Sequence, residues 1–304
     1  MKLIVPAYYS AFSCIAGDCH HSCCIGWEID IDEATAAKYR TYPGQIGDRM
    51  RAQIDFTADP PHFILQGRDE RCPFLDERGL CDIILSCGEG ALCQICTDHP
   101  RFRNYFSDRT EMGLGLCCEA AASLVLGYDA PLALICLSDD GTDGTPTEEE
   151  SAFFELRQKL FSLLQNRELP IDERLDNILA LVGAGRISRP MADMASFLSE
   201  LEILDEAWEQ MLSRIGADTM PLPGNAAEQL TAYLLMRHLP KVLDGEEPWG
   251  IVSFAVFAHD LIAALFAKTD GTFESLCEIV RLFSSEIEYS EENLYALFDE
   301  IASS

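Results

Sequence analysis

Apolar side chains recur at helical spacing through most of the second half of the chain. The first such segment, residues 153–164, follows a Thr147/Glu150 pattern that is typical of a capping box. Proline and glycine signals then separate further segments of helical length, which cover residues 172–182, 190–215, 226–239, 251–267, 272–283 and 290–301. The pattern predicts an all-helical C-terminal domain.

The first half of the chain lacks this sustained periodicity. Residues 27–31 and 62–65 have the character of short strands, and Glu33 to Tyr39, with Asp32 as N-cap, reads as a helix. The long connections between them lack the periodic apolar residues that would order them through a hydrophobic core. A bound metal could order them instead. We therefore predict a mainly α fold, in which a loop-rich, metal-stapled, cysteine-rich N-terminal region precedes the helical domain.

Cysteine usage divides the chain in the same way. Eleven of the thirteen cysteines lie between Cys14 and Cys118. Residues 138–150 are rich in glycine, threonine and acidic residues, which is typical of a linker. We therefore predict a cysteine-rich metal-binding domain over residues 1–137, an acidic linker over 138–150 and an acidic all-helical domain over 151–304.

Charge and hydropathy limit the partners. The formal net charge is −29, so a phosphate backbone would be repelled and nucleic acid is not an expected partner. The longest apolar window, residues 253–267, is interrupted by His259 and Asp260, and we expect no membrane span. The first residues lack the form of a signal peptide, which predicts a cytoplasmic protein with reduced thiols.

The clustered cysteines are the strongest chemical signal. They form two groups, Cys14-x4-Cys19-x3-Cys23-Cys24 and Cys72-x8-Cys81-x5-Cys87-x5-Cys93-x2-Cys96, followed by Cys117-Cys118. Thiolates at such spacings can converge on one metal centre, and their ligand type suits zinc and a four-iron cluster equally. Cys136 and Cys277 stand alone in apolar surroundings, and we interpret them as small buried hydrophobes. Histidines among the cysteines, with His20-His21 the best placed, are weaker candidate ligands.

The same region resembles the flagellin lysine-N-methylases over about its first 125 residues. The matching motifs are Tyr8-x3-Phe12-x-Cys14-Ile15, Cys19-x3-Cys23-Cys24-x-Gly26-Trp27-x-Ile29-x-Ile31-Asp32, Cys72-Pro73-Phe74-Leu75-x4-Leu80-Cys81-x-Ile83, Gly88-Glu89-x2-Leu92-Cys93-x2-Cys96-x3-Pro100-Arg101 and Leu116-Cys117-x-Glu119-Ala120-Ala121. The resemblance implies methyl transfer from S-adenosylmethionine to lysines of flagellin, by a protein that carries an iron–sulfur cluster, 4Fe-4S in type.

The resemblance also implies the metal ligands. The cysteines that fall on the family's positions are Cys14, Cys19, Cys23, Cys24, Cys72, Cys81, Cys93, Cys96 and Cys117. Cys118 stands where the family has a proline, and Cys87 lies outside the pattern. The first motifs also resemble a wider group of small zinc- or iron-chelating domains, so a non-enzymatic zinc- or iron-binding protein is the alternative interpretation.

The sequence assigns no catalytic base and no methyl-donor residues. No Rossmann fingerprint is present, and the glycines of residues 182–185 fit a helix end better than a nucleotide loop. Asp30, Asp32, Glu89 and Glu119 could remove a proton from lysine, but each also reads as a helix cap or a solvated charge.

Overall fold

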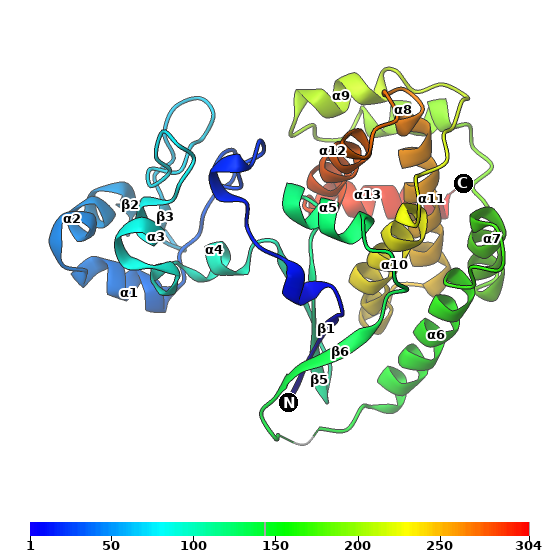
Figure 1. The fold of residues 1–304 in the computed structure, drawn as a ribbon, viewed down its shortest axis with the longest axis horizontal. Helices are drawn as coiled ribbons and strands as arrows, with labels where there is room; N and C mark the ends of the chain where they lie inside the picture. Colours follow the sequence, from blue (N-terminus) through cyan, green and yellow to red (C-terminus); the bar gives the residue numbers. More distant parts are fainter. Residues whose placement is uncertain (143, 304) are drawn as a thin grey trace. The chain divides into compact units, whose positions relative to one another are not determined.

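The computed structural model describes residues 1–142 and 144–303, which contain thirteen α-helices and two β-sheets (Figure 1). About half of the chain, 52%, is helical, so the predicted mainly α fold is confirmed. The helices from α6 onward are Glu148–Leu164 (α6), Ile171–Leu181 (α7), Met191–Leu198 (α8), Glu206–Leu212 (α9), Ala226–His238 (α10), Pro248–Phe266 (α11), Phe273–Phe283 (α12) and Glu291–Ala302 (α13).

The chain forms two compact units. Ser13–Arg101 make one, here called the cysteine-rich unit, and Met1–Phe12 together with the chain from Phe102 onward make the other, the helical unit. This division by contacts differs from the predicted division by composition, whose linker spans the end of a strand and the start of α6; residue 143 of that linker lies outside the described residues. The predicted domain boundaries stay a prediction.

A four-stranded sheet belongs to the helical unit. Its strand order is β4-β5-β1-β6, and the strands are Lys2–Pro6 (β1), Arg101–Tyr105 (β4), Arg109–Leu114 (β5) and Leu134–Asp139 (β6). Strand β1 runs parallel to β5 and antiparallel to β6. The sequence analysis did not predict these strands, because their pairing partners lie far apart in the sequence and local periodicity does not reveal them.

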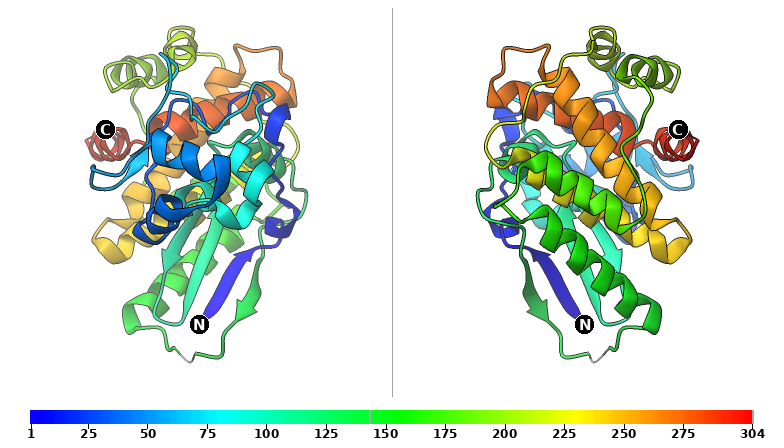
Figure 2. Two further views of the ribbon diagram at one scale, coloured as in Figure 1. Left: turned by 90° about the vertical axis from the view of Figure 1, so that its left-hand side faces the viewer. Right: turned by 90° about the vertical axis from the view of Figure 1, so that its right-hand side faces the viewer.

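Helix α6 lies along one face of this sheet (Figure 2). The predicted capping box is present: the Thr147 hydroxyl accepts from the Glu150 amide at 3.1 Å, and the Glu150 carboxylate accepts from the Thr147 amide at 2.9 Å. The same carboxylate accepts from the Ser107 amide at 2.8 Å, which fixes the start of α6 to the β4–β5 turn. Phe153 stacks on Phe106 with ring centroids 5.6 Å apart.

One predicted helix is divided in two. Residues 190–215 form α8 and α9 with an irregular segment between them. The Glu286 carboxylate accepts from the amides of Leu204 and Asp205, at 2.9 and 2.6 Å, and Asp205 then caps α9. A tertiary contact therefore satisfies the amides that a continuous helix would have used internally.

Helix α11 lies at the centre of the helical core. It is long and apolar enough to cross a membrane, but 83% of its most apolar window is buried inside the protein. It packs against α10, α7, α12 and α13, so its apolar surface is covered by other helices. This is the pattern expected of a core helix in a large helical unit.

The cysteine-rich unit has a small core of its own. Its elements are Glu33–Thr41 (α1), Gly44–Gln53 (α2), Ile54–Asp55 (β2), His62–Phe63 (β3), Asp82–Cys87 (α3) and Gln94–Asp98 (α4). Tyr39, Met50 and Phe74 are fully buried in it. The predicted N-cap is confirmed, since Asp32 accepts from the Thr35 amide at 2.9 Å.

Residues 27–31 do not form the predicted strand, but the predicted alternation of buried and exposed side chains is present. Ile29 and Ile31 are buried while Asp30 is exposed, and Asp30 forms a single bridge with His62. The segment pairs with its neighbour through this single bridge, and a regular strand needs more paired residues than one.

Candidate metal centre

Five cysteine side chains come together in the core of the cysteine-rich unit. Cys72 and Cys93 are buried, and Cys24, Cys81 and Cys96 pack against the same apolar cluster. Burial, together with the neighbouring thiols at positions 24, 81 and 93, raises the pKa of Cys72 to about 12. Thiolates gathered so closely repel one another unless a cation neutralises them.

Backbone pairing brings the two sequence groups of cysteines together. The Cys72 amide donates to the Cys24 carbonyl at 2.8 Å, and Leu75 forms a bridge with Cys81. Cys93 is the N-cap of α4 and Cys96 lies in the first turn of that helix, so their thiols lie on the same side of one turn. The fold therefore joins thiols that the sequence places far apart.

Backbone amides favour the thiolate form at three of these cysteines. The Phe74 amide acts to lower the pKa of Cys72, and the Cys96 amide acts to lower that of Cys93. The amides two and three residues downstream act in the same way on the pKa of Cys81. Amide donors near sulfur are a recognised feature of cluster-ligating cysteines. These donors fit thiolate-bound metal.

The spacing of the thiols can be compared with that of a single-ion site. A tetrahedral zinc with bonds of about 2.3 Å separates its sulfurs by about 3.8 Å. Among the residues that the structure describes, the group of three potential ligands whose atoms all lie within 4.8 Å of one another is Glu28, Asp30 and His62, and no three thiols meet this criterion. No group of three thiols among the described residues is therefore as compact as a closed zinc site.

The other predicted ligands lie outside this apolar cluster, although the thiol of Cys23 contacts that of Cys24. Cys14 and Cys23 are exposed and Cys19 is half-buried in the loops of the cysteine-rich unit, while Cys117 is buried in the helical unit. Cys277 is buried in α12 as expected. The same expectation was wrong for Cys136, which is exposed on β6, because this segment is an edge strand of the sheet and not a core helix.

Cys117 lies beside a buried polar network that the sequence did not reveal. Its core is Glu288, whose carboxylate accepts from the Tyr233 hydroxyl at 3.0 Å and lies 2.7 Å from Nε2 of His238. Arg237 donates to the Tyr233 hydroxyl at 2.9 Å and to the Glu288 carbonyl at 3.3 Å. Glu288 ends a π-helical turn, Ser284–Glu288, that continues α12.

The negative charge of Glu288 is compensated by its partners in the network. Burial opposes ionisation of Glu288, yet the Arg237 charge and the His238 hydrogen bond hold its pKa below its usual value. Burial also lowers the pKa of His238. Arg237, Tyr233 and His238 belong to α10, and all three contact Glu288 or the Tyr233–Glu288 pair. The network therefore connects α10 to the π-helical turn. In the sequence, this network could have been found from the Arg237-His238 pair and from the acidic residues that interrupt otherwise apolar helical segments.

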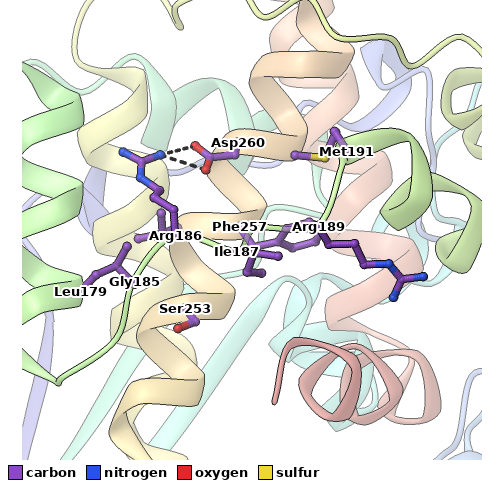
Figure 3. Close-up of a pocket in the computed structure, with 10 residues that line it drawn as sticks. Leu179, Gly185, Arg186, Ile187, Arg189, Met191, Ser253, Phe257 and Asp260 are labelled. Carbon is purple, nitrogen blue, oxygen red and sulfur yellow. Dashed lines mark hydrogen bonds and ion pairs between the residues drawn. The ribbon is translucent and has the colours of Figure 1, made fainter. Parts of the chain in front are cut away.

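A small cavity lies between the α7–α8 connection and α11 (Figure 3). Its volume is about 30 Å³, far below that of small-molecule sites. Arg186 crosses it and binds Asp260 at 2.7 and 2.9 Å. Gly183 has a positive φ of 75° directly after α7, which confirms that these glycines mark a helix end.

A larger groove follows α6 where that helix faces β5 and β6. Its volume is about 370 Å³, within the range of small-molecule sites. Phe154, Phe161, Gln158 and Gln165 line it. Its arginines are paired with carboxylates: Arg109 with Asp108, and Arg157 with Glu111.

Comparison with known proteins gives a consistent result. No family model and no solved structure matches the chain. The chain is 28% identical over 171 residues to the Lysine-N-methylase of Salmonella choleraesuis strain SC-B67, and 27% identical to that of Salmonella typhimurium strain LT2. Each alignment covers 52% of this chain and 40% of the relative.

A third relative is the Flagellar biosynthetic protein FliU of Salmonella muenchen, which is 28% identical over 141 residues. This alignment covers 42% of the chain and 79% of that protein. The chain thus matches less than half the length of the two lysine-N-methylases. These similarities support the predicted resemblance of the chain to the lysine-N-methylases over about half of its length.

Proposed function

We propose that the protein is a lysine N-methyltransferase. The observation that carries the proposal is the similarity to two proteins named Lysine-N-methylase, together with the ordered cysteine motifs between Tyr8 and Ala121. The alternative of a non-enzymatic zinc- or iron-chelating protein is not favoured, because these relatives are named for an enzymatic activity.

Flagellin is the proposed substrate and S-adenosylmethionine the proposed methyl donor, in the bacterial cytoplasm. The name of the FliU relative refers to the flagellum, which supports this substrate. The net charge of −29 would attract lysine-bearing surfaces. A lysine with an unperturbed pKa of about 10.4 must lose a proton before its nitrogen can attack a methyl group, so the methylation rate should rise with pH.

We further propose that the cysteine-rich unit holds an iron–sulfur cluster through four of the five thiols in its core. The candidates are Cys24, Cys72, Cys81, Cys93 and Cys96. Their convergence in one core and the nearby amides that favour their thiolate forms support this ligand set. A bound cluster would supply one-electron chemistry or a rigid crosslink. Cys14, Cys19, Cys23 and Cys117 stay predicted ligands.

The groove along α6 is our candidate for the methyl-donor site. The ring of Phe161 can stack on an adenine, whereas the ring of Phe154 is already covered by the guanidinium groups of Arg109 and Arg157. The amides of Gln158 and Gln165 can both donate and accept hydrogen bonds. The volume of about 370 Å³ is compatible with a nucleoside and its substituent.

The test is mass spectrometry of flagellin produced with and without this protein. We expect additional methyl units on flagellin lysines when the protein is present, and loss of these units when it carries Cys72→Ser. Cys136→Ser is the matched control, because this thiol is exposed and lies outside the thiol core. Unmodified flagellin in the presence of metal-loaded protein would refute the enzymatic proposal, and calorimetric titration without heat from S-adenosylmethionine would favour the chelating alternative.

A further inference from the structure

A second group of potential metal ligands lies on the cysteine-rich unit, separate from the thiols. A carboxylate oxygen of Glu28, one of Asp30 and a ring nitrogen of His62 all lie within 4.8 Å of one another. Glu28 and Asp30 are exposed and His62 is half-buried, so solvent ions can reach them.

Backbone hydrogen bonding between the two segments fixes the positions of these three residues. Asp30 and His62 are direct partners in an antiparallel bridge, and the Phe63 amide donates to the Ile29 carbonyl at 3.1 Å. Glu28 precedes Asp30 by two residues and therefore points to the same side of the extended segment. The residues of opposite orientation, Ile29 and Ile31, are 4% and 1% exposed and anchor the segment in the core.

The charge of the group is uncompensated. Glu28 and Asp30 have no ion pair with a lysine or arginine among residues 1–142 and 144–303. The nearby Asp55, which faces His62 across the β2–β3 pair, instead uses its carboxylate for the amide and hydroxyl of Thr57, at 2.8 and 2.6 Å. Two carboxylates held close together repel each other, and a cation between them would remove that repulsion.

The donor set selects the kind of cation. Carboxylates suit hard ions such as Mn²⁺, while an imidazole favours first-row transition ions over Ca²⁺ and Mg²⁺, which prefer oxygen ligands alone. Three protein ligands also leave positions for water. We propose that Glu28, Asp30 and His62 form a binding site for a divalent first-row transition ion, independent of the thiols and of the proposed methyl transfer.

Mn²⁺ is the appropriate probe, because thiolates select softer metals and Mn²⁺ in solution gives an electron paramagnetic resonance signal that decreases on binding. The full chain, purified without oxygen, is titrated with MnCl₂. We expect one saturable site, and at least about tenfold weaker binding for His62→Gln and for Asp30→Asn. Asp48→Asn, an exposed carboxylate on α2 of the same unit, should bind as the wild type does.

The titration gives clear contrary outcomes. Wild-type protein that leaves the Mn²⁺ signal unchanged overturns the site. Equal affinity of His62→Gln and wild type also overturns it, and so does an equal loss in His62→Gln and Asp48→Asn, since that pattern indicates diffuse attraction to an acidic surface. Circular dichroism of each variant verifies that the unit is folded, and Glu28→Gln repeats the test at the third ligand.

Discussion

The amide of Cys72 donates a hydrogen bond of 2.8 Å to the carbonyl oxygen of Cys24. This single contact joins the two cysteine groups of the sequence, and the adjacent bridge between Ile25 and Arg71 reinforces it. Because the backbone makes the connection, the fold of the unit itself brings the two groups of thiols together. The contribution of each thiol to metal binding can be tested one at a time.

Cys72→Ser and Cys96→Ser should each remove most of the iron and acid-labile sulfide that we expect to copurify with the protein. A serine hydroxyl is a poor substitute for a soft thiolate at iron. Elemental analysis and visible absorption of protein purified without oxygen provide the measurement. Cys136→Ser should retain the wild-type content, and one equivalent of zinc without sulfide in the wild type would contradict the cluster.

The same ligand variants should make residues 13–101 sensitive to proteases while the helical unit stays resistant. Metal binding energy contributes to folding, and the cysteine-rich unit has only a small apolar core to replace it. Limited proteolysis followed by mass spectrometry locates the cuts. Wild-type resistance in both Cys72→Ser and Cys96→Ser would show that the apolar core of this unit is sufficient.

Removing one partner of the buried ion pair between Arg157 and Glu111 should strongly destabilise the protein. Arg157 donates to the two carboxylate oxygens of Glu111 at 2.5 and 2.8 Å, and both side chains are almost fully buried. Glu111→Ala should reduce the free energy of unfolding by about 3–5 kcal/mol, because it leaves a buried charge unpaired. Urea denaturation measures this loss, and the double variant Glu111→Leu with Arg157→Met should recover much of it.

The stability of the helical unit should fall as the pH falls below about 6.5, the ordinary pKa of histidine. Burial lowers the pKa of His238, so the unfolded chain binds a proton there that the folded unit does not. Glu288, whose folded pKa is also lowered, adds to the loss at more acidic pH. Thermal melts between pH 7 and 5 should show a smaller decline for His238→Gln; parallel declines would exclude this histidine as the cause.

Phe161→Ala should weaken binding of S-adenosylmethionine about tenfold if the groove along α6 holds the donor, since stacking on an aromatic ring contributes about 1–3 kcal/mol per base. Isothermal titration calorimetry gives the dissociation constant. Tyr105→Ala is the control, because this ring is 75% exposed on β4 and lies outside the groove. Unchanged affinity in Phe161→Ala would move the donor site elsewhere.

Sequence reasoning succeeded where the determinants were local. The capping box of Thr147 and Glu150 and the Asp32 cap are formed by residues three positions apart, and both are present in the structure. The apolar periodicity also located the helices of the C-terminal half, because their core-facing sides repeat at a fixed spacing.

Long-range pairing explains what the sequence did not reveal. Strand β1 is defined by partners beyond residue 108, and the break between α8 and α9 depends on Glu286 in the π-helical turn after α12. The candidate site shows the same division. The type of ligand was apparent from the cysteines, but the selection of Cys24 with the second group follows from a backbone hydrogen bond that no spacing rule contains.

The placement of β1 has a consequence for synthesis on the ribosome. This strand is synthesised before its two neighbours, β5 and β6, which begin only at Arg109 and Leu134. The entire cysteine-rich unit is translated in the interval and can fold, and acquire metal, while Lys2–Pro6 still lack partners. The unpaired apolar strand must therefore be protected until the sheet closes, so we expect chaperones to cover Lys2–Pro6 on the nascent chain until β6 has been made.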